Sequence, residues 1–275
     1  MKQFVLRVII FVLIGVAAFH VKSYLLLRND KYQRKVSAHE VYHVIGKSKK
    51  KNGAKKILLG DSVARQFFNS EAESDTLNSL ASNQAISLAG QYILLENYMK
   101  AGNKIDTCYA VFIPSSFQNN LNQLFTYNYY VKPFYKDEYK QYRTPTVETQ
   151  IAKIPYHGIA QYFCILTNNW APEFESEDKN NYGFFSPISV EYIHKMSALA
   201  QKNHFKLIFV PALSNENQRK NIEGFDKNEL VKNHLEHEFA TYFDDIIYID
   251  SQYFVDDMHL ANPEQFKDRY KKLIR

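Results

Sequence analysis

The sequence predicts an α/β protein with a three-layer α/β/α fold, in which helices cover both faces of a doubly wound parallel sheet. Short apolar runs recur along residues 57–275, and several end at a glycine or a proline, which is typical of buried parallel strands. Segments with the helical spacing of apolar residues lie between these runs. Strands that alternate with helices pair in parallel through crossover connections, so the two observations together predict the fold class.

Five strands and four helices are expected in this part of the chain. The predicted strands are residues 56–59, 84–89, 107–114, 204–210 and 246–250. The predicted helices are residues 92–100, 187–203 and 227–242, with a last one from about residue 263. Pro187 and Pro263 suit a first helical position, where the missing N–H costs nothing. Ligands of such sheets bind beyond the carboxyl ends of the strands, so the residues that follow strands are the candidates for a site.

Residues 117–185 interrupt this alternation. These 69 residues contain 17 aromatic side chains, and a segment of this length without a simple pattern is usually functional or a small subdomain. We interpret it as an insertion that caps the strand ends. Its aromatic residues either form a small core packed on the sheet or partly serve as stacking platforms for a sugar chain, with Tyr127, Tyr130 and Trp170 as candidates.

The N-terminus contains an apolar segment. Residues 8–19 form an unbroken apolar run preceded by Lys2 and Arg7, short for a membrane-spanning helix of about 20 residues. An uncleaved signal anchor fits this pattern better than a cleaved signal peptide, because small residues suited to a cleavage site are poorly placed. The chain is therefore expected to comprise an anchor over residues 1–24, a basic stem over 25–56, and an α/β domain over 57–275.

The net charge of +5 is unevenly distributed. Residues 1–56 hold 13 basic and two acidic residues, a net charge of +11, and the remaining residues carry −6. A nucleic-acid-binding body is disfavoured, because neutralising phosphates needs a basic face on the folded part. Two cysteines exclude a disulfide framework and a multi-cysteine zinc module. We expect no metal site and no cofactor.

Candidate catalytic residues follow the first and last predicted strands. Gly60-Asp61-Ser62 follows the first, and Asp256-Asp257-Met258-His259 follows the last. A serine hydroxyl needs a base to act as a nucleophile, and His259 would accept the proton of Ser62. Asp256 would orient the imidazole and stabilise its charged form, although Asp257 lies nearby. Each motif is weak alone, and their joint placement after the first and last strands strengthens both.

These blocks resemble the SGNH (GDSL-type) hydrolase superfamily. The first block matches Leu58-Leu59-Gly60-Asp61-Ser62, the last matches Asp256-x-x-His259, and the glycine of the second block matches Gly90 in Ser87-Leu88-Ala89-Gly90. The resemblance implies a flavodoxin-like sheet and a Ser62, His259 and Asp256 triad. It also implies that the backbone N–H groups of Ser62 and Gly90 stabilise an oxyanion.

The third block of the superfamily, Gly-x-Asn-Asp, is absent. Ile113-Pro114-Ser115-Ser116-Phe117-Gln118-Asn119-Asn120 stands in its place. Ser116 or Asn119 would then supply the side-chain oxyanion donor, or the site lacks that donor.

The anchored layout is similar to that of SGNH proteins of bacterial envelopes that take part in alginate O-acetylation or D-alanyl-lipoteichoic acid biosynthesis. The resemblance implies a serine esterase or O-acyltransferase that acts on cell-envelope or extracellular polysaccharide through an acyl-enzyme. It also implies a single-pass protein of the cytoplasmic membrane with its body on the periplasmic or extracytoplasmic side, beside a polytopic membrane acyltransferase. The alternative is a catalytically degenerate carbohydrate-binding or scaffold protein of a polysaccharide-modification system.

Overall fold

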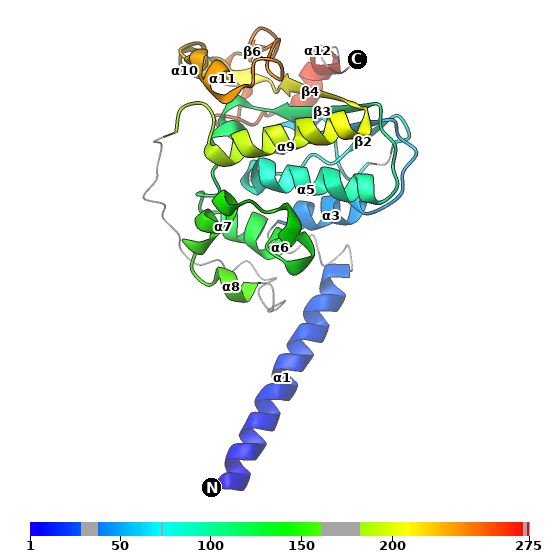
Figure 1. Cartoon of the computed structure of the whole chain (residues 1–275), viewed down its shortest axis with the longest axis vertical. Coiled ribbons are helices and arrows are strands. Elements are labelled where there is room, and N and C mark those ends of the chain that lie inside the picture. Colours follow the sequence, from blue (N-terminus) through cyan, green and yellow to red (C-terminus); the bar gives the residue numbers. More distant parts are fainter. Residues whose placement is uncertain (29–37, 73, 161–181, 272–273, 275) are drawn as a thin grey trace.

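Four parallel strands form the central sheet of the computed structural model, which describes residues 1–28, 38–72, 74–160, 182–271 and 274 (Figure 1). The strands are β1 (Lys56–Gly60), β2 (Leu77–Ser79), β3 (Thr107–Phe112) and β4 (Lys206–Pro211), in the order β2-β1-β3-β4. Two further short strands, β5 (Ser214–Asn215) and β6 (Tyr248–Ile249), pair in parallel with each other, and only Ala212 and Leu213 separate β5 from β4. The protein is therefore a mixed α/β protein with a parallel sheet, as predicted.

Successive side chains of a strand point to opposite sides, and both faces of β1 and β3 are buried, whereas β4 is buried only over its last three residues. Ile57, Leu59 and Ala110 belong to one core cluster, whereas Leu58 and Val111 belong to another. The first cluster lies under α5 (Ser87–Lys100) and α9 (Pro187–Asn203), which pack side by side (Figure 1). The second contains residues of α4 (Ser62–Phe67) and of the C-terminal η8 (Pro263–Phe266). Helices thus cover the sheet from both sides.

The predicted strand over residues 84–89 is wrong. These residues form the 3-10 turn η1 (Gln84–Ile86) and the first turn of α5, and β2 at Leu77–Ser79 takes the expected place in the sheet. A fully buried helix start and a buried strand are both continuous apolar runs, so periodicity does not separate them. Asn83 caps η1 by accepting the N–H of Ala85, which favours the helical form.

The first two helices predicted after the insertion have different outcomes. α9 spans the predicted residues 187–203, with Ser186 as N-cap and His204 in a left-handed conformation at its end. The predicted helix over 227–242 is largely wrong: only α11 (Asn228–Asn233) is helical, and His234 ends it with φ of 55°. The remaining elements after β4 are η6 (Glu216–Gln218), α10 (Arg219–Glu223), η7 (Ser251–Tyr253) and α12 (Lys267–Lys271).

The described part of the predicted insertion packs onto α5 and α9. It consists of η2 (Pro114–Gln118), η3 (Tyr127–Val131), α6 (Lys132–Phe134), η4 (Asp137–Tyr142), α7 (Pro145–Ala152) and α8 (His157–Ala160). Tyr127 and Tyr130 are 1% and 0% exposed and belong to the same cluster as the sheet. A buried ring has no face to offer a sugar, so these two tyrosines extend the core and do not form the stacking platform considered above. Trp170 lies outside the described residues.

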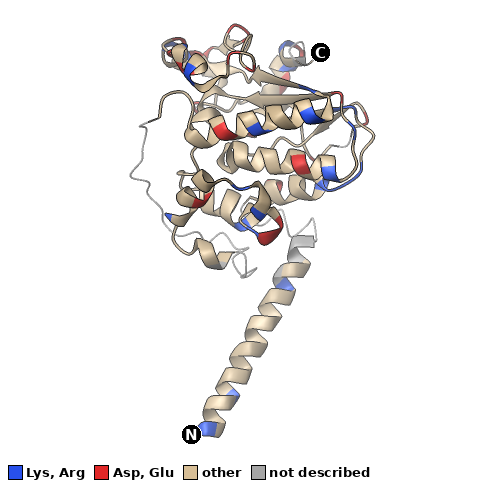
Figure 2. Cartoon of the chain, viewed as in Figure 1, with Lys and Arg blue, Asp and Glu red and all other residues tan. Residues whose placement is uncertain are grey.

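A long helix, α1 (Lys2–Arg28), extends away from the body (Figure 1). Its residues 2–22 are long and apolar enough to cross a membrane, and none of that window is buried in the protein. The helix carries no charged residue between Arg7 and Lys22 (Figure 2).

Part of the predicted stem is folded onto the body. The helix α3 (His39–Ser48) packs against α5, and its Val41 and Val44 are fully buried in the core cluster of that side. Lys47 donates to the backbone oxygens of Ser70 and Ala72. Residues 38–48 thus pack onto the globular body, although they lie within the predicted stem.

Candidate active site

Three side chains from distant parts of the chain form a hydrogen-bonded row. The Nε2 atom of His259 lies 2.8 Å from the Oγ atom of Ser62, and its Nδ1 atom lies 2.8 Å from Oδ2 of Asp256. Ser62 begins α4 directly after β1, whereas the other two residues lie in the loop that follows η7. The structure therefore brings together the three residues that the sequence pointed to, and such a row can move the hydroxyl proton of a serine onto an imidazole.

Asp256 is held in place by its own loop. Its Oδ1 atom accepts the backbone N–H groups of Met258, at 2.8 Å, and of His259, at 2.6 Å. Partial burial acts to raise the pKa of the Asp256 carboxyl, but the hydrogen bonds from His259 and Met258 outweigh it and lower that pKa. The neighbouring Asp257 is exposed, and it is the Asp256 carboxylate that accepts the hydrogen bond from Nδ1 of His259. Asp256 is therefore the aspartate that orients the imidazole.

Gln66 fixes the histidine loop to α4. Its Nε2 atom donates to the backbone oxygen of Leu260, at 3.1 Å, and its Oε1 atom accepts the N–H of Leu260, at 3.2 Å. Gln66 stands four residues after Ser62, so both lie on the same side of α4. Sequence reasoning missed this residue, and helical spacing from Ser62 was the available signal.

Asp61 ties the ends of two strands together from the inside. It is 0% exposed, and its Oδ1 atom accepts the N–H groups of Val63 and Ala64, which caps α4. Its Oδ2 atom accepts the N–H of Ile113, at 2.9 Å, and the hydroxyl of Ser116, at 2.7 Å. Burial raises the pKa of Asp61, against these four hydrogen bonds. Asp61 thus has a structural role that the motif alone did not reveal.

Gly60 is required by the close approach of α4 and β3. A Cβ atom there would lie 2.5 Å from the Cβ atom of Ala64 and 2.7 Å from the backbone oxygen of Val111. The carbonyl oxygen of Gly60 accepts a hydrogen bond from Nε2 of Gln91, at 2.7 Å. The absence of a side chain lets β1 turn directly into α4 and present Ser62 at the end of the strand.

The expected oxyanion donors are only partly in place. Ser62 is the first residue of α4, so its N–H has no acceptor within the helix and is free to bind an oxyanion. Gly90 is the fourth residue of α5, where its N–H belongs to the first helical hydrogen bond, to Ile86. The expectation for Gly90 is therefore wrong, and it follows from the wrong strand over residues 84–89.

Neither proposed replacement for the third block is free. Asn119 is 1% exposed; its amide donates to the backbone oxygen of Gln84, and its Oδ1 atom accepts the N–H of Leu121. The hydroxyl of Ser116 donates a hydrogen bond to the Asp61 carboxylate. Both residues hold loops together, so the expectation that either stabilises an oxyanion is not met by these contacts.

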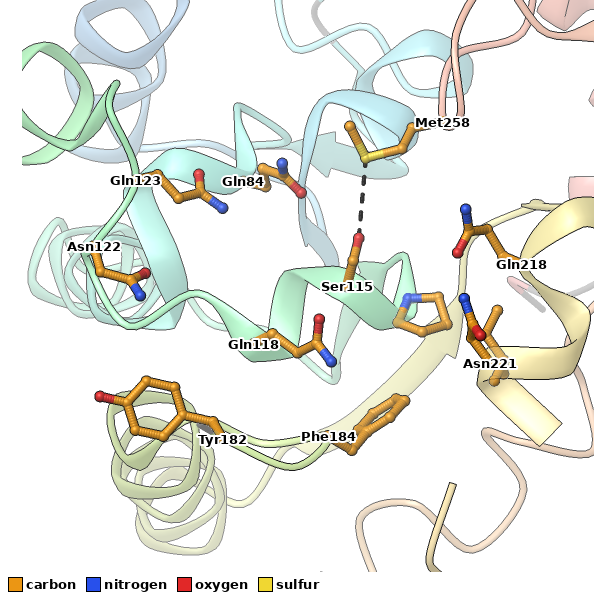
Figure 3. Close-up of a pocket in the computed structure, with 12 residues that line it drawn as sticks. Gln84, Ser115, Gln118, Asn122, Gln123, Tyr182, Phe184, Gln218, Asn221 and Met258 are labelled. Atoms are coloured by element: carbon orange, nitrogen blue, oxygen red, sulfur yellow. Dashed lines mark hydrogen bonds between the residues drawn. The ribbon is translucent and has the colours of Figure 1, made fainter. Parts of the chain in front are cut away.

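Two separate hollows are lined by neighbouring residues of the histidine loop, Met258 in one and His259 in the other. Ser62 and His259 line an open one of about 480 Å³, to which α3 contributes His39 and α4 contributes Arg65. The other is a groove of about 680 Å³, which we call the amide groove. Figure 3 shows Met258 and Ser115 at its edge, where the Ser115 hydroxyl lies 4.0 Å from the Met258 sulfur, and several amide side chains around it.

No protein-family model matches the chain, and no curated protein sequence matches it. Within the described residues, no group of three or more His, Cys, Asp or Glu side chains is placed to hold a metal ion.

Proposed function

We propose that this protein is a membrane-anchored, serine-dependent esterase or O-acyltransferase of the SGNH type that acts on a polysaccharide or acylated glycan of the cell envelope. The observation that carries the proposal is the row from Ser62 through His259 to Asp256, with two hydrogen bonds of 2.8 Å. The burial of both faces of β1 and β3 and the strand order β2-β1-β3-β4 support a three-layer fold of that type.

The reaction would proceed through an acyl-enzyme. Nε2 of His259 takes the proton of Ser62 as Oγ forms a bond to the carbonyl carbon of the ester. The tetrahedral intermediate collapses when His259 returns this proton to the departing alcohol oxygen, which leaves an acyl ester on Ser62. A water molecule or a sugar hydroxyl then loses its proton to His259 and attacks the acyl carbon, and Ser62 recovers its proton. The negative charge of Asp256 stabilises the imidazolium in both halves.

The charge on the carbonyl oxygen needs at least two donors, of which the N–H of Ser62 is one. We propose Asn83 as the second donor. The N–H of the preceding residue, Ser82, bonds the carbonyl oxygen of Gly60, so Asn83 lies beside the turn that presents Ser62. The Oδ1 atom of Asn83 is engaged with Ala85, which leaves its Nδ2 atom as the donor for the oxyanion.

Location follows from α1. A helix able to cross a membrane immediately before the body supports a single-pass anchor in the bacterial cytoplasmic membrane. We place the body on the extracytoplasmic side, where envelope polysaccharides are modified and where a polytopic acyltransferase would deliver acyl groups.

Labelling with a serine-directed fluorophosphonate tests the role of Ser62. The wild-type protein should be labelled, and Ser62→Ala should lose the label because the nucleophilic oxygen is gone. Ser115→Ala is the matched control, since this exposed serine lies near the site but bonds Met258 and not the histidine. Undiminished labelling of Ser62→Ala would refute the assignment.

A second function, a catalytically degenerate carbohydrate-binding scaffold, is favoured by one observation. Gly90 and Asn119, two expected oxyanion donors, are engaged in structural contacts. Turnover of an acetyl ester by the wild-type protein separates the two functions, because a scaffold would give none above the rate of Ser62→Ala.

A further inference from the structure

The amide groove is lined by side chains that both donate and accept hydrogen bonds. Six amide residues surround it, and they come from segments far apart in the sequence: Gln84, Gln118, Asn122, Gln123, Gln218 and Asn221 (Figure 3). Its volume of about 680 Å³ falls within the range of ordinary ligand pockets. The convergence of one side-chain type from η1, η2, the following loop, η6 and α10 indicates a built binding surface.

Four of these six amide side chains make no hydrogen bond to another described residue. Among the described residues, the side chains of Asn122, Gln123, Gln218 and Asn221 make no hydrogen bond, and each is at least partly exposed. The Oε1 atom of Gln84 is buried and has no hydrogen-bond partner in the described structure. The four side chains with at least partly exposed amides are therefore available to a ligand that offers both donors and acceptors.

The charge of the groove selects the class of ligand. None of the twelve described residues that line it is charged, and a smaller hollow of about 270 Å³ that Met258 also lines adds Asp257 as its one charged described residue. A phosphate or uronate would lose hydration there without meeting a positive side chain. Hydroxyl groups, in contrast, donate and accept like the amides themselves, and the partly exposed Tyr182 and Met258 offer apolar surface for the C–H faces of sugar rings.

We infer that the amide groove binds an uncharged polyhydroxylated chain, a neutral glycan, as the acyl donor or acceptor; its link to acyl transfer rests on the proposed function. Met258 lines the groove and precedes His259, so their Cα atoms are about 3.8 Å apart. A sugar bound along the groove would therefore contact the residue that precedes the proposed base, whose own side chain lines the separate hollow of Ser62.

A panel of immobilised oligosaccharides tests this inference. The full-length protein in detergent is applied to neutral, uronate-containing and phosphorylated glycans, and affinities are measured for the ones it binds. The variant Gln118→Ala/Asn221→Ala removes two amides from opposite parts of the groove. The control Asn217→Ala removes an exposed amide next to Gln218 that does not line it.

We expect neutral glycans to bind, the double variant to lose about tenfold in affinity, and Asn217→Ala to bind as the wild type does. Thermal unfolding checks that the double variant is folded. A preference for charged glycans, binding of no neutral glycan, or equal affinity of the folded double variant would overturn the inference. Hydrolysis of a small aryl acetate, measured on the same samples, distinguishes the two proposals. If the proposed triad is wrong, the protein shows no turnover but still binds the glycan. If the proposed groove is wrong, the protein hydrolyses the aryl acetate but binds no neutral glycan.

Discussion

At the scale of single residues, the site depends on two neighbours of the nucleophile that do no chemistry. Asp61 accepts four hydrogen bonds from α4 and from the end of β3, and Gly60 leaves room for both elements. Together they determine where Ser62 stands. The Gly-Asp-Ser motif is thus as much a packing requirement as a catalytic one.

Gly60→Ala should destabilise the protein by about 1–3 kcal/mol or more, because the added methyl would overlap Ala64 and the backbone of β3. Gly53→Ala is the matched control, since a Cβ atom there meets nothing within 4 Å. Urea unfolding of the two variants measures the difference. Equal unfolding midpoints would contradict the packing described for the end of β1.

Asp256→Asn should lower turnover of an aryl acetate by about 10⁴-fold, as expected when an imidazole loses its anionic partner. Asp257→Asn should retain activity, because the histidine is bound by Asp256.

The lowered pKa of Asp256 adds a signature in stability. Its stabilising bonds are fully present above the usual value of 3.8 and are lost as the pH falls through the lowered value of the folded state. The difference in melting temperature between the wild type and Asp256→Asn should therefore shrink below about pH 3.8. A difference that grew with acidity would contradict this role.

At the scale of elements, some parts could be predicted and others could not. The runs at β1, β3 and β4 are apolar and bounded by turn residues, so their burial is visible in the sequence. β2 is only Leu77-Asn78-Ser79, which is not an apolar run and could not be recognised as a strand. The apolar residues at the buried start of α5 were interpreted as that strand instead. The wrong position of Gly90 followed from this one confusion.

The triad was predictable for a different reason. It needed only the position of two motifs after two strands, and strand ends of a parallel sheet meet at one edge. The sequence did not predict the roles proposed for Asn83, Gln66 and the amide groove, because amide residues form no recognisable motif. Only the fold shows which amide side chains lie close together. The aromatic insertion could not be interpreted from composition, since tyrosines of a core and of a sugar platform are alike in sequence.

The helix α3 leads to a prediction about where the protein can be cut. Removal of residues 1–37 should leave a folded body, whereas removal of residues 1–49 should destabilise it strongly. The longer deletion takes away the buried Val41 and Val44 and uncovers α5, and loss of each such side chain costs about 2–3 kcal/mol. Thermal unfolding of the two fragments decides the matter. Equal melting temperatures would contradict the inclusion of α3 in the body.

At the scale of the whole molecule, the anchor and the candidate site are close along the chain. His39 lines the hollow of Ser62, and it stands 11 residues after Arg28, the end of α1. A fully extended chain of that length spans about 40 Å at most. With α1 in a membrane, the proposed triad would lie near the membrane surface, which suits a substrate that is attached to the envelope or an acyl group delivered from a membrane protein.

The charge of the molecule divides in the same way. The first 56 residues carry a net charge of +11, and the rest carries −6. The amide groove is neutral within this body. The net positive charge of the chain therefore comes from its N-terminal part and says little about the substrate.

The central claim is that Ser62 forms an acyl-enzyme, and rapid mixing of the full-length protein with a p-nitrophenyl acyl ester tests it most directly. The account predicts an initial burst of nitrophenolate that matches the amount of protein, with the acyl group recovered on Ser62 by mass spectrometry. Ser62→Ala should show no burst. An absent burst together with an unmodified Ser62, or a burst of the same size in Ser62→Ala, would contradict the account.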